Sequence, residues 1–161
     1  RYVTPQPVRT GVTNFLRNLR SPLIVANQLL QGDIGGTGEG IARFAINSTV
    51  GVVGLIDVAA MAGMPYEPED FGQTLGVWGA GHGFYVVLPL MGPSSLRDAV
   101  GMAVDSYADP LRIYLFNTDN EGWHYARIGL SALDQRTELL DALEDLQKNS
   151  LDYYAALRSA Y

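Results

Sequence analysis

The sequence contains no cysteine, and Lys148 is its only lysine. Without cysteine the chain has neither a disulfide framework nor a thiolate site, and its redox compartment cannot be inferred. Charged residues make up 17% of the 161 residues, against about 25% in typical soluble domains, which indicates little water-facing surface. The basic residues are few and are not interleaved with aromatic ones, which argues against a nucleic-acid partner.

Long hydrophobic runs and targeting signals are also lacking. No uncharged helical run reaches the ~18–20 residues that a membrane-spanning helix needs. The chain opens at Arg1, without an initiator methionine or a signal peptide. We therefore expect a mature or trimmed fragment from which targeting information has been removed.

The length and charge fit a single domain, residues 1–161, large enough to bury roughly 70% of its unfolded surface. The net charge of −6 is unevenly spread. Residues 1–50 contain five arginines and two acidic residues, and residues 51–97 contain one arginine and four acidic residues. Residues 98–161 contain five basic and eleven acidic residues. A basic front end and an acidic back end suggest faces toward different partners.

The most unusual stretch runs from Glu69 to Arg97 and includes 26 consecutive uncharged residues. Its glycines disfavour a helix interior, and Pro89 excludes a central strand. We predict an irregular apolar hairpin with its bend at Gly79–Gly83 and its arm at Phe84–Met91. Such a hairpin either folds over the core or faces a lipid or a partner. The predicted hinge residues are Gly79, Gly81 and Gly83.

The N-terminal third is predicted to be helical. Apolar residues at helical spacing over 8–19 lie beside an arginine stripe, which suits solvent, lipid headgroups or an acidic partner. Ser21-Pro22 then starts a short helix, Leu23–Leu30, which Gly32 ends. The glycine-rich segment Gly35–Gly40 is predicted to be a flexible connector.

Two apolar segments fill Ile41–Met61, with a predicted break near Asn47–Gly51. The second, Val50–Met61, is apolar around nearly its whole circumference, which predicts a buried helix. Asp57 inside it must be paired, hydrogen-bonded or protonated, and Arg43 and Arg97 are its candidate partners. A structural ion pair and a polar residue lining an apolar conduit both remain open.

Downstream, Glu69–Asp70 is predicted to cap a short helix through Leu75, and Pro93-Ser94-Ser95 to cap a helix that Asp109-Pro110 ends. One face of that helix is apolar, with Leu96, Ala99, Val100, Ala103 and Tyr107. From Trp123 the chain is predicted to be helical, with buried leucines over 139–146 and a tyrosine stripe over 153–161. No stretch indicates paired strands, so the predicted fold class is all-α.

Patterns typical of catalytic and metal sites are missing. Gly79–Gly83 lacks the Lys-Ser/Thr of a phosphate-binding loop, and His82 and His124, the only histidines, are not at ligand spacing. Ser94 and Ser95 lie outside any G-x-S-x-G elbow. We therefore predict no catalytic residue, no metal, no cofactor and no enzymatic activity.

Several motifs together closely resemble the MlaA (VacJ) family of outer-membrane lipoproteins. They are TPQPVRTGVTNFLRNL, NQLLQGD, RFAINSTVGVVGLIDVAAMAG, EDFGQTLGVWGAGHGFYVVLPLMGPSSLRDAVG and LDQRTELLD. The resemblance runs from about Tyr2 to the C-terminus. Its most specific part extends from FGQTLG, which begins at Phe71, to LRD, which ends at Asp98.

The resemblance implies an α-helical, ring-shaped protein in the periplasmic leaflet of the outer membrane. Such a protein passes phospholipid misplaced in the outer leaflet through an amphipathic channel to a soluble periplasmic carrier, which maintains lipid asymmetry. The resemblance also implies association with trimeric porins. In the parent protein it implies an acyl anchor on an N-terminal cysteine, which this chain lacks.

In such a ring we expect the hairpin Gly76–Gly92 to form one wall of the lipid path. Irregular backbone is tolerated at membrane depth only where it lines a cavity or packs on protein. The expected acyl-chain contacts are Phe71, Leu75, Tyr85, Leu88 and Leu90, and the expected headgroup contacts are Asp57 and Arg97. Two alternative functions remain open, a membrane-associated interaction scaffold without a lipid conduit and a lipid hydrolase.

Overall fold

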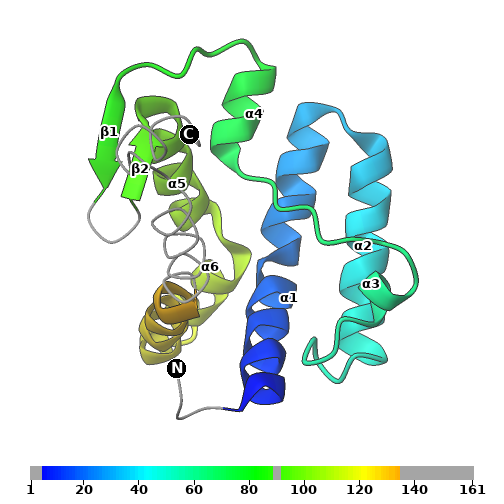
Figure 1. The fold of residues 1–161 in the computed structure, drawn as a ribbon. Helices are drawn as coiled ribbons and strands as arrows, with labels where there is room; N and C mark the ends of the chain where they lie inside the picture. Colours follow the sequence, from blue (N-terminus) through cyan, green and yellow to red (C-terminus); the bar gives the residue numbers. More distant parts are fainter. Residues whose placement is uncertain (1–4, 89–91, 135–161) are drawn as a thin grey trace, which may run out of the picture.

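The computed structural model describes residues 5–88 and 92–134, whose regular structure is helical apart from one two-stranded ribbon (Figure 1). The elements are α1 (Gln6–Gln31), α2 (Ile34–Thr49), α3 (Val58–Met61), α4 (Phe71–Val77), β1 (Tyr85–Leu88), β2 (Gly92–Ser95), α5 (Leu96–Ala108), α6 (Pro110–Asn117) and a helix over 121–134. The all-α class is confirmed. Helix α1 lies between α2 and α3 on one side and α5 and α6 on the other. No helix in the described ranges is long and apolar enough to cross a bilayer.

Helix α1 is continuous where two helices were predicted. Pro22 lies inside it and removes one backbone hydrogen bond. The helix nevertheless continues, because Leu23, Ile24 and other residues of its inner face are buried and α1 packs along α2. Its end at Gly32 was predicted correctly. Gly32 has a φ of 78°, and its N–H points to the carbonyls of Gln28 and Leu29.

The glycine-rich segment 35–40 forms the first turns of α2, so the prediction of a flexible connector was wrong. Asp33 caps the helix, because its carboxylate accepts a hydrogen bond from the Gly36 N–H at 2.9 Å. A Cβ atom on Gly40 would lie 2.8 Å from Oε1 of Gln28. Because glycine has no Cβ, its presence at this position allows α2 to pack closely against α1.

The segment that follows α2 is a tight turn, so the predicted buried helix Val50–Met61 was also wrong. Only its last four residues, α3, are helical. Val52, Val53 and Gly54 have positive φ values of 53°, 60° and 89°, and the two valines are 56% and 60% exposed. A pattern that is apolar on all sides predicts burial for a helix, but residues 50–57 form a turn, and Val52 and Val53 reach the surface.

The apolar hairpin is an antiparallel ribbon, which the sequence did not predict. Tyr85 in β1 pairs with Ser95 in β2, and Val87 pairs with Pro93. The chain therefore reverses between β1 and β2, and Gly79–Gly83 links α4 to β1 instead of forming the bend. Proline is compatible with this pairing, because each strand of a two-stranded ribbon is an edge strand.

Helix α5 exposes its apolar face and buries the opposite one. Leu96, Val100 and Tyr107 are exposed, whereas Gly101 and Asp105 are buried. The reason is the packing of α5 on α4, which Gly101 permits because it has no side chain. The predicted cap is present, since Ser95 accepts a hydrogen bond from the Asp98 N–H. The faces predicted over 139–146 and 153–161 lie outside the described residues.

Candidate functional site

The described residues place many polar side chains inside and large apolar ones outside. The buried apolar side chains among them are Leu23, Ile24 and Ala59. The buried polar ones are Asn18, Asn27, Gln28, Arg43, Asn47, Thr74, Ser94, Ser95, Asp105, Asp109 and His124. Water-soluble domains show the opposite preference, so this exterior suits surroundings other than water.

A first buried polar cluster joins α1, α4 and α5. Asn27 donates to Oδ1 of Asp105 at 3.0 Å and accepts a hydrogen bond from the Thr74 hydroxyl at 3.1 Å. The other oxygen of Asp105 accepts a hydrogen bond from the backbone N–H of Phe71 at 3.0 Å. These groups satisfy one another, as buried polar atoms must. Hydrogen bonds between buried side chains therefore hold these three helices together. In a typical water-soluble protein, apolar contacts would do so.

A second cluster centres on Arg43 and Asp57. The Arg43 guanidinium donates to both carboxylate oxygens, at 3.0 and 3.2 Å, and to the carbonyl of Met64. Burial tends to raise the pKa of Asp57, but hydrogen bonds from the Ala60 N–H, Asn47 and Arg43 outweigh this and hold its pKa below the ordinary value. Asp57 is therefore an ionised, paired carboxylate, and Arg43 is the partner among the two candidates.

His124 forms a third polar site, on the 121–134 helix. Its ring meets those of Phe116 and Tyr125 edge-on, at centroid distances of 5.4 and 5.7 Å. Its Nδ1 is buried without a hydrogen-bond partner. Burial lowers the pKa of His124, and the positive charges of Arg127 and Arg112 lower it further. The ring is therefore neutral at neutral pH.

We expect this histidine to make the fold less stable in mild acid. Because its pKa lies below 6.5 only in the folded chain, the unfolded chain binds the proton first as the pH falls, and stability present above that value is lost. The free energy of unfolding should thus fall between about pH 7.5 and about pH 5.5. His124→Phe should remove most of the loss, as measured by denaturant unfolding at both pH values. An equal loss in this variant would assign the effect to other groups.

Three of the predicted acyl-chain contacts are described, two on α4 and one on β1. Phe71 and Leu75 are half-buried on α4, where Phe71 packs edge-on against Trp78 with ring centroids 5.8 Å apart. Tyr85 is exposed on β1. The side chain of Leu88 and the whole of Leu90 lie outside the described residues. Of the predicted hinge residues, Gly79 and Gly83 have positive φ values of 93° and 71°, and Gly81 does not.

The structure separates the two predicted headgroup contacts. Arg97 begins α5 and pairs with Asp98 at 3.1 Å. Asp57 precedes α3 and pairs with Arg43 of α2. Because α1 lies between α3 and α5 (Figure 1), these residues belong to different regions of the molecule.

An open groove of about 760 Å³ lies between the first half of α1 and the segment around α3. Its lining residues are Gln6, Pro7, Thr10, Gly11, Asn14, Leu55, Ile56, Asp57, Ala60 and Met61. Asp57 is the only charged residue among them. The groove is therefore largely apolar and carries one charged side chain.

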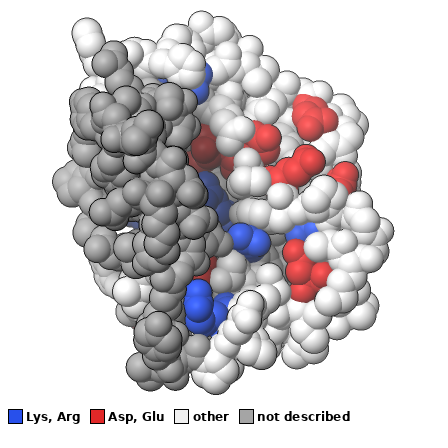
Figure 2. Space-filling view, in the orientation of Figure 1, with Lys and Arg blue, Asp and Glu red and all other residues white. Residues whose placement is uncertain are grey.

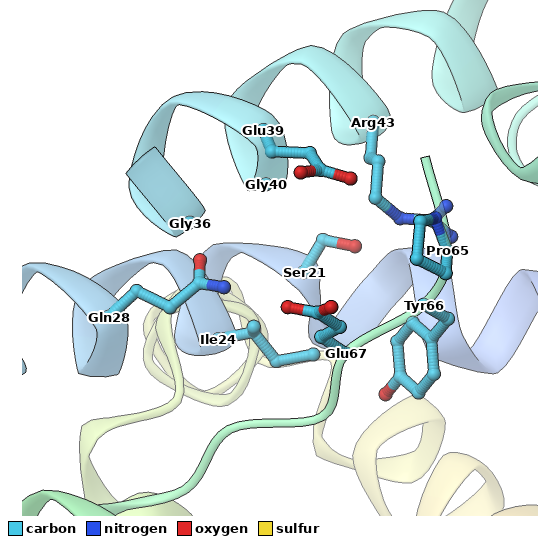
Figure 3. A pocket seen from close by; sticks show the side chains of 10 residues that line it. All are labelled: Ser21, Ile24, Gln28, Gly36, Glu39, Gly40, Arg43, Pro65, Tyr66 and Glu67. Atoms are coloured by element: carbon cyan, nitrogen blue, oxygen red, sulfur yellow. The ribbon is translucent and has the colours of Figure 1, made fainter. Parts of the chain in front are cut away.

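A cavity of about 20 Å³ lies further along α1 (Figure 3). It is lined by Ser21, Ile24, Gln28, Gly36, Glu39, Gly40, Arg43, Pro65, Tyr66 and Glu67. In Figure 3 the carboxylates of Glu39 and Glu67 and the hydroxyl of Ser21 point toward one another. The volume suits one or two water molecules or a group of that size. No cluster of metal-ligating side chains occurs in residues 5–88 and 92–134.

The charged groups are gathered within an uncharged exterior. Figure 2 shows them mostly toward the middle of one face, with uncharged surface above and below. The exposed apolar side chains include Ile34 and Ile41 on α2, Val52 and Val53 after it, and Met61 on α3. An exterior of this kind marks a contact surface for a membrane or a partner.

The sequence analysis missed the polar interior. A signal was present, because Asn14, Asn18 and Gln28 recur at helical spacing along one side of α1. The sequence analysis interpreted this helix from its apolar stripe over 8–19 and did not consider its polar side. Thr74 and Asp105 gave no such signal, since only the packing of α4 and α5 brings them to Asn27.

Comparison with known proteins gives consistent matches over the whole chain. A family model described as MlaA lipoprotein matches residues 1–161. The intermembrane phospholipid transport system lipoprotein MlaA of Escherichia coli strain K12 is 37% identical over 164 residues, which cover 100% of this chain and 63% of that protein. A protein of Rickettsia felis is 36% identical over 159 residues, which cover 98% of this chain and 62% of that protein.

A solved structure also matches, with a TM-score of 0.77 and 36% identity over 99% of this chain and 78% of the other. It is described as "Structural basis for maintenance of bacterial outer membrane lipid asymmetry". The chain spans less than two thirds of the length of the two relatives above.

Proposed function

Because this chain belongs to the MlaA lipoprotein family, we propose that it transports phospholipid and that its apolar exterior sits in the outer membrane. In this proposal it takes phospholipid misplaced in the outer leaflet and passes it along an amphipathic path to a soluble periplasmic carrier. The result is maintenance of lipid asymmetry. The name of the Escherichia coli relative and the subject of the matching structure support this function.

The single observation that carries the proposal is the polar interior inside an apolar exterior. Burying apolar surface stabilises a protein by about 25 cal/mol per Å², yet Ile34, Met61 and Phe84 are 70%, 80% and 80% exposed. In a bilayer these side chains leave water without being in a protein core. Lipid surroundings also require internally satisfied polar groups, and the Asn27–Asp105 and Arg43–Asp57 bonds are of this kind.

The ribbon is proposed as one wall of the lipid path. Phe71, Leu75, Tyr85, Leu88 and Leu90 would contact acyl chains, and Arg97 would contact a headgroup from the start of α5. Gly79 and Gly83, whose φ values favour glycine, would let the ribbon move relative to α4. No covalent step is needed, because lipid moves along a gradient of affinity.

The proposed partners are phospholipid, a trimeric porin beside the protein in the membrane, and the periplasmic carrier that receives the lipid. In the full-length protein an acyl anchor would hold the chain at the periplasmic leaflet. The alternatives are an interaction scaffold, which would carry no lipid, and a lipid hydrolase, which would release fatty acid.

The proposal is tested by lipid content and by one exposed residue of the ribbon region. The purified chain should carry intact phospholipid detectable by mass spectrometry. A charge on a lipid-facing surface costs about 2–4 kcal/mol near the midplane, so Phe84→Arg should lower vesicle association by about thirtyfold or more with an unchanged melting temperature. Phe84→Leu, the control, should behave as the unaltered chain. Absence of bound lipid would favour the scaffold, and fatty acid release the hydrolase.

A further inference from the structure

A row of aromatic rings that includes one arginine joins α5, α6 and the 121–134 helix, which lie together on one side of α1 (Figure 1). The Cζ atom of Arg112 lies 4.7 Å from the centre of the Tyr107 ring and 4.7 Å from the centre of the Phe116 ring. The Phe116 ring lies 6.4 Å from the Tyr125 ring, centre to centre. These contacts attract the guanidinium through its charge and hold it in place. We call these four residues the aromatic row.

The fold does not use the hydrogen-bond donors of Arg112. Throughout the described ranges its guanidinium makes no hydrogen bond and no ion pair. The ring contacts do not satisfy its N–H groups, because these donors point outward in the plane of the guanidinium. The side chain is half-buried, so some of its hydration is lost. An anionic acceptor at its edge would replace that hydration with charge-assisted hydrogen bonds.

The charges near Arg112 also favour an anion. Arg127 and Asp109 form an ion pair and offset each other. Beyond the effect of burial, the charges of Arg127 and Arg112 lower the pKa of His124, and that of Asp109 raises it, which indicates an excess of positive charge. Arg112 is also the third residue of α6, whose first turn has no acidic residue. The helix dipole disfavours a cation at that end, so helix stability does not account for this arginine.

The exposed side chains of these helices suit a membrane interface. Tyr107 and Tyr125, at the two ends of the aromatic row, are 71% and 61% exposed, and Tyr114 and Trp123 are 64% and 72% exposed. Tyrosine and tryptophan combine an apolar ring with a polar group and are enriched at the headgroup level of membranes. By contrast, the exposed large apolar side chains of 50–61 include no aromatic ring. The rings therefore favour a phosphate that belongs to a lipid over a soluble one.

We propose that Arg112 and the aromatic row bind the phosphate of an anionic phospholipid at the membrane surface, outside the lipid path. The guanidinium donates to two phosphate oxygens side by side, a geometry that lysine cannot reproduce. A zwitterionic headgroup binds less well, because its ammonium group is repelled by the excess positive charge. The inference rests on the membrane location in the proposed function and adds a lipid that holds this side of the molecule at headgroup level.

Flotation of the whole chain with vesicles tests the inference. The vesicles contain phosphatidylcholine alone or phosphatidylcholine with a minority of phosphatidylglycerol. Arg112→Gln should weaken association with the phosphatidylglycerol vesicles about fivefold, which is the contribution of one basic residue near an anionic surface. It should hardly change association with phosphatidylcholine. Arg112→Lys keeps the charge and should recover only part of the loss. The circular dichroism of both variants should match that of the unaltered chain.

Arg9→Gln is the matched control. Arg9, on α1, is half-buried as well, and its guanidinium has no ring contact within the part of the chain that the structure describes. It should therefore weaken association with the phosphatidylglycerol vesicles less than Arg112→Gln does. Equal losses in the two variants would mean attraction by net charge alone and would overturn the inference, as would full recovery by Arg112→Lys.

Two further outcomes separate this inference from other readings. Calorimetric titration with inorganic phosphate, without vesicles, should show no saturable binding. Binding that Arg112→Gln abolishes would assign the site to a soluble phosphate and overturn the lipid assignment. If Arg112→Gln associates like the unaltered chain, which still carries phospholipid, the inference fails and the proposed function stands. Failure of the unaltered chain to associate with either kind of vesicle would instead overturn the proposed function.

Discussion

Asp57→Leu is expected to lower the free energy of unfolding by about 3–5 kcal/mol, because it leaves a buried guanidinium without its counter-charge. Arg43 is 8% exposed, and its bonds go to Asp57 and to the carbonyl of Met64. The substitution also removes the cap of α3, since Asp57 accepts the hydrogen bond from Ala60 N–H. Denaturant unfolding followed by circular dichroism gives the measurement.

Two control variants distinguish the loss of the ion pair from the change in side-chain shape as the cause of the lower stability. Asp57→Asn keeps the shape and part of the hydrogen bonding, so it should cost less. Arg43→Met combined with Asp57→Leu should recover much of the loss, because the unpaired charge is then gone. If Asp57→Leu unfolds like the unaltered chain but changes lipid binding, Asp57 acts in a lipid path and not in a structural pair.

Gly101→Val is expected to destabilise the fold by about 3 kcal/mol or more, which is at the upper end for an overpacked site. A Cβ atom at this position would lie 2.2 Å from the backbone nitrogen of Gly72 and 2.6 Å from its Cα. Both are backbone atoms and cannot move aside as the end of a side chain can. Separating α4 from α5 would also break the bond from the Phe71 N–H to Asp105. The melting temperature is the measurement.

Gly38→Ala is the matched control for this substitution. Gly38 is also inside a helix, and a Cβ there meets nothing within 4 Å. Alanine at such a position should leave the stability unchanged or raise it by up to about 1 kcal/mol. A melting temperature equal to that of the unaltered chain in Gly101→Val would mean that α4 and α5 are not packed as closely as the structure has them.

The sequence predicted features that depend on local chemistry. The helix start at Asp70, the cap at Ser95 and the end at Gly32 are all present. Each depends on a short polar side chain or a glycine acting within one turn. Arg43 was one of two candidate partners predicted for Asp57, since a carboxylate in an apolar segment needs a partner and few basic residues were available.

The predictions that failed depended on the surroundings of the chain. Val52 and Val53 were assigned to a buried helix, because apolar residues are expected to avoid water. In the structure both are exposed. The ribbon was missed because glycine and proline, which are rare in strands, interrupt the strand pattern of 85–95. Its formation also depends on the pairing of β1 with β2. The polar cluster of Asn27, Thr74 and Asp105 depends on tertiary packing, which no local pattern encodes.

The polar interior also sets how stability responds to temperature. Exposing apolar surface on unfolding raises the heat capacity by about 0.45 cal/K/mol per Å², and exposing polar surface lowers it by about 0.26. In the described part of this chain, most of the fully buried side chains are polar. The heat-capacity increment should therefore fall below the usual ~12–15 cal/mol/K per residue. A small increment flattens the curve of the free energy of unfolding against temperature. Cooling should therefore lower the free energy of unfolding of this protein far less than that of a protein with an apolar core.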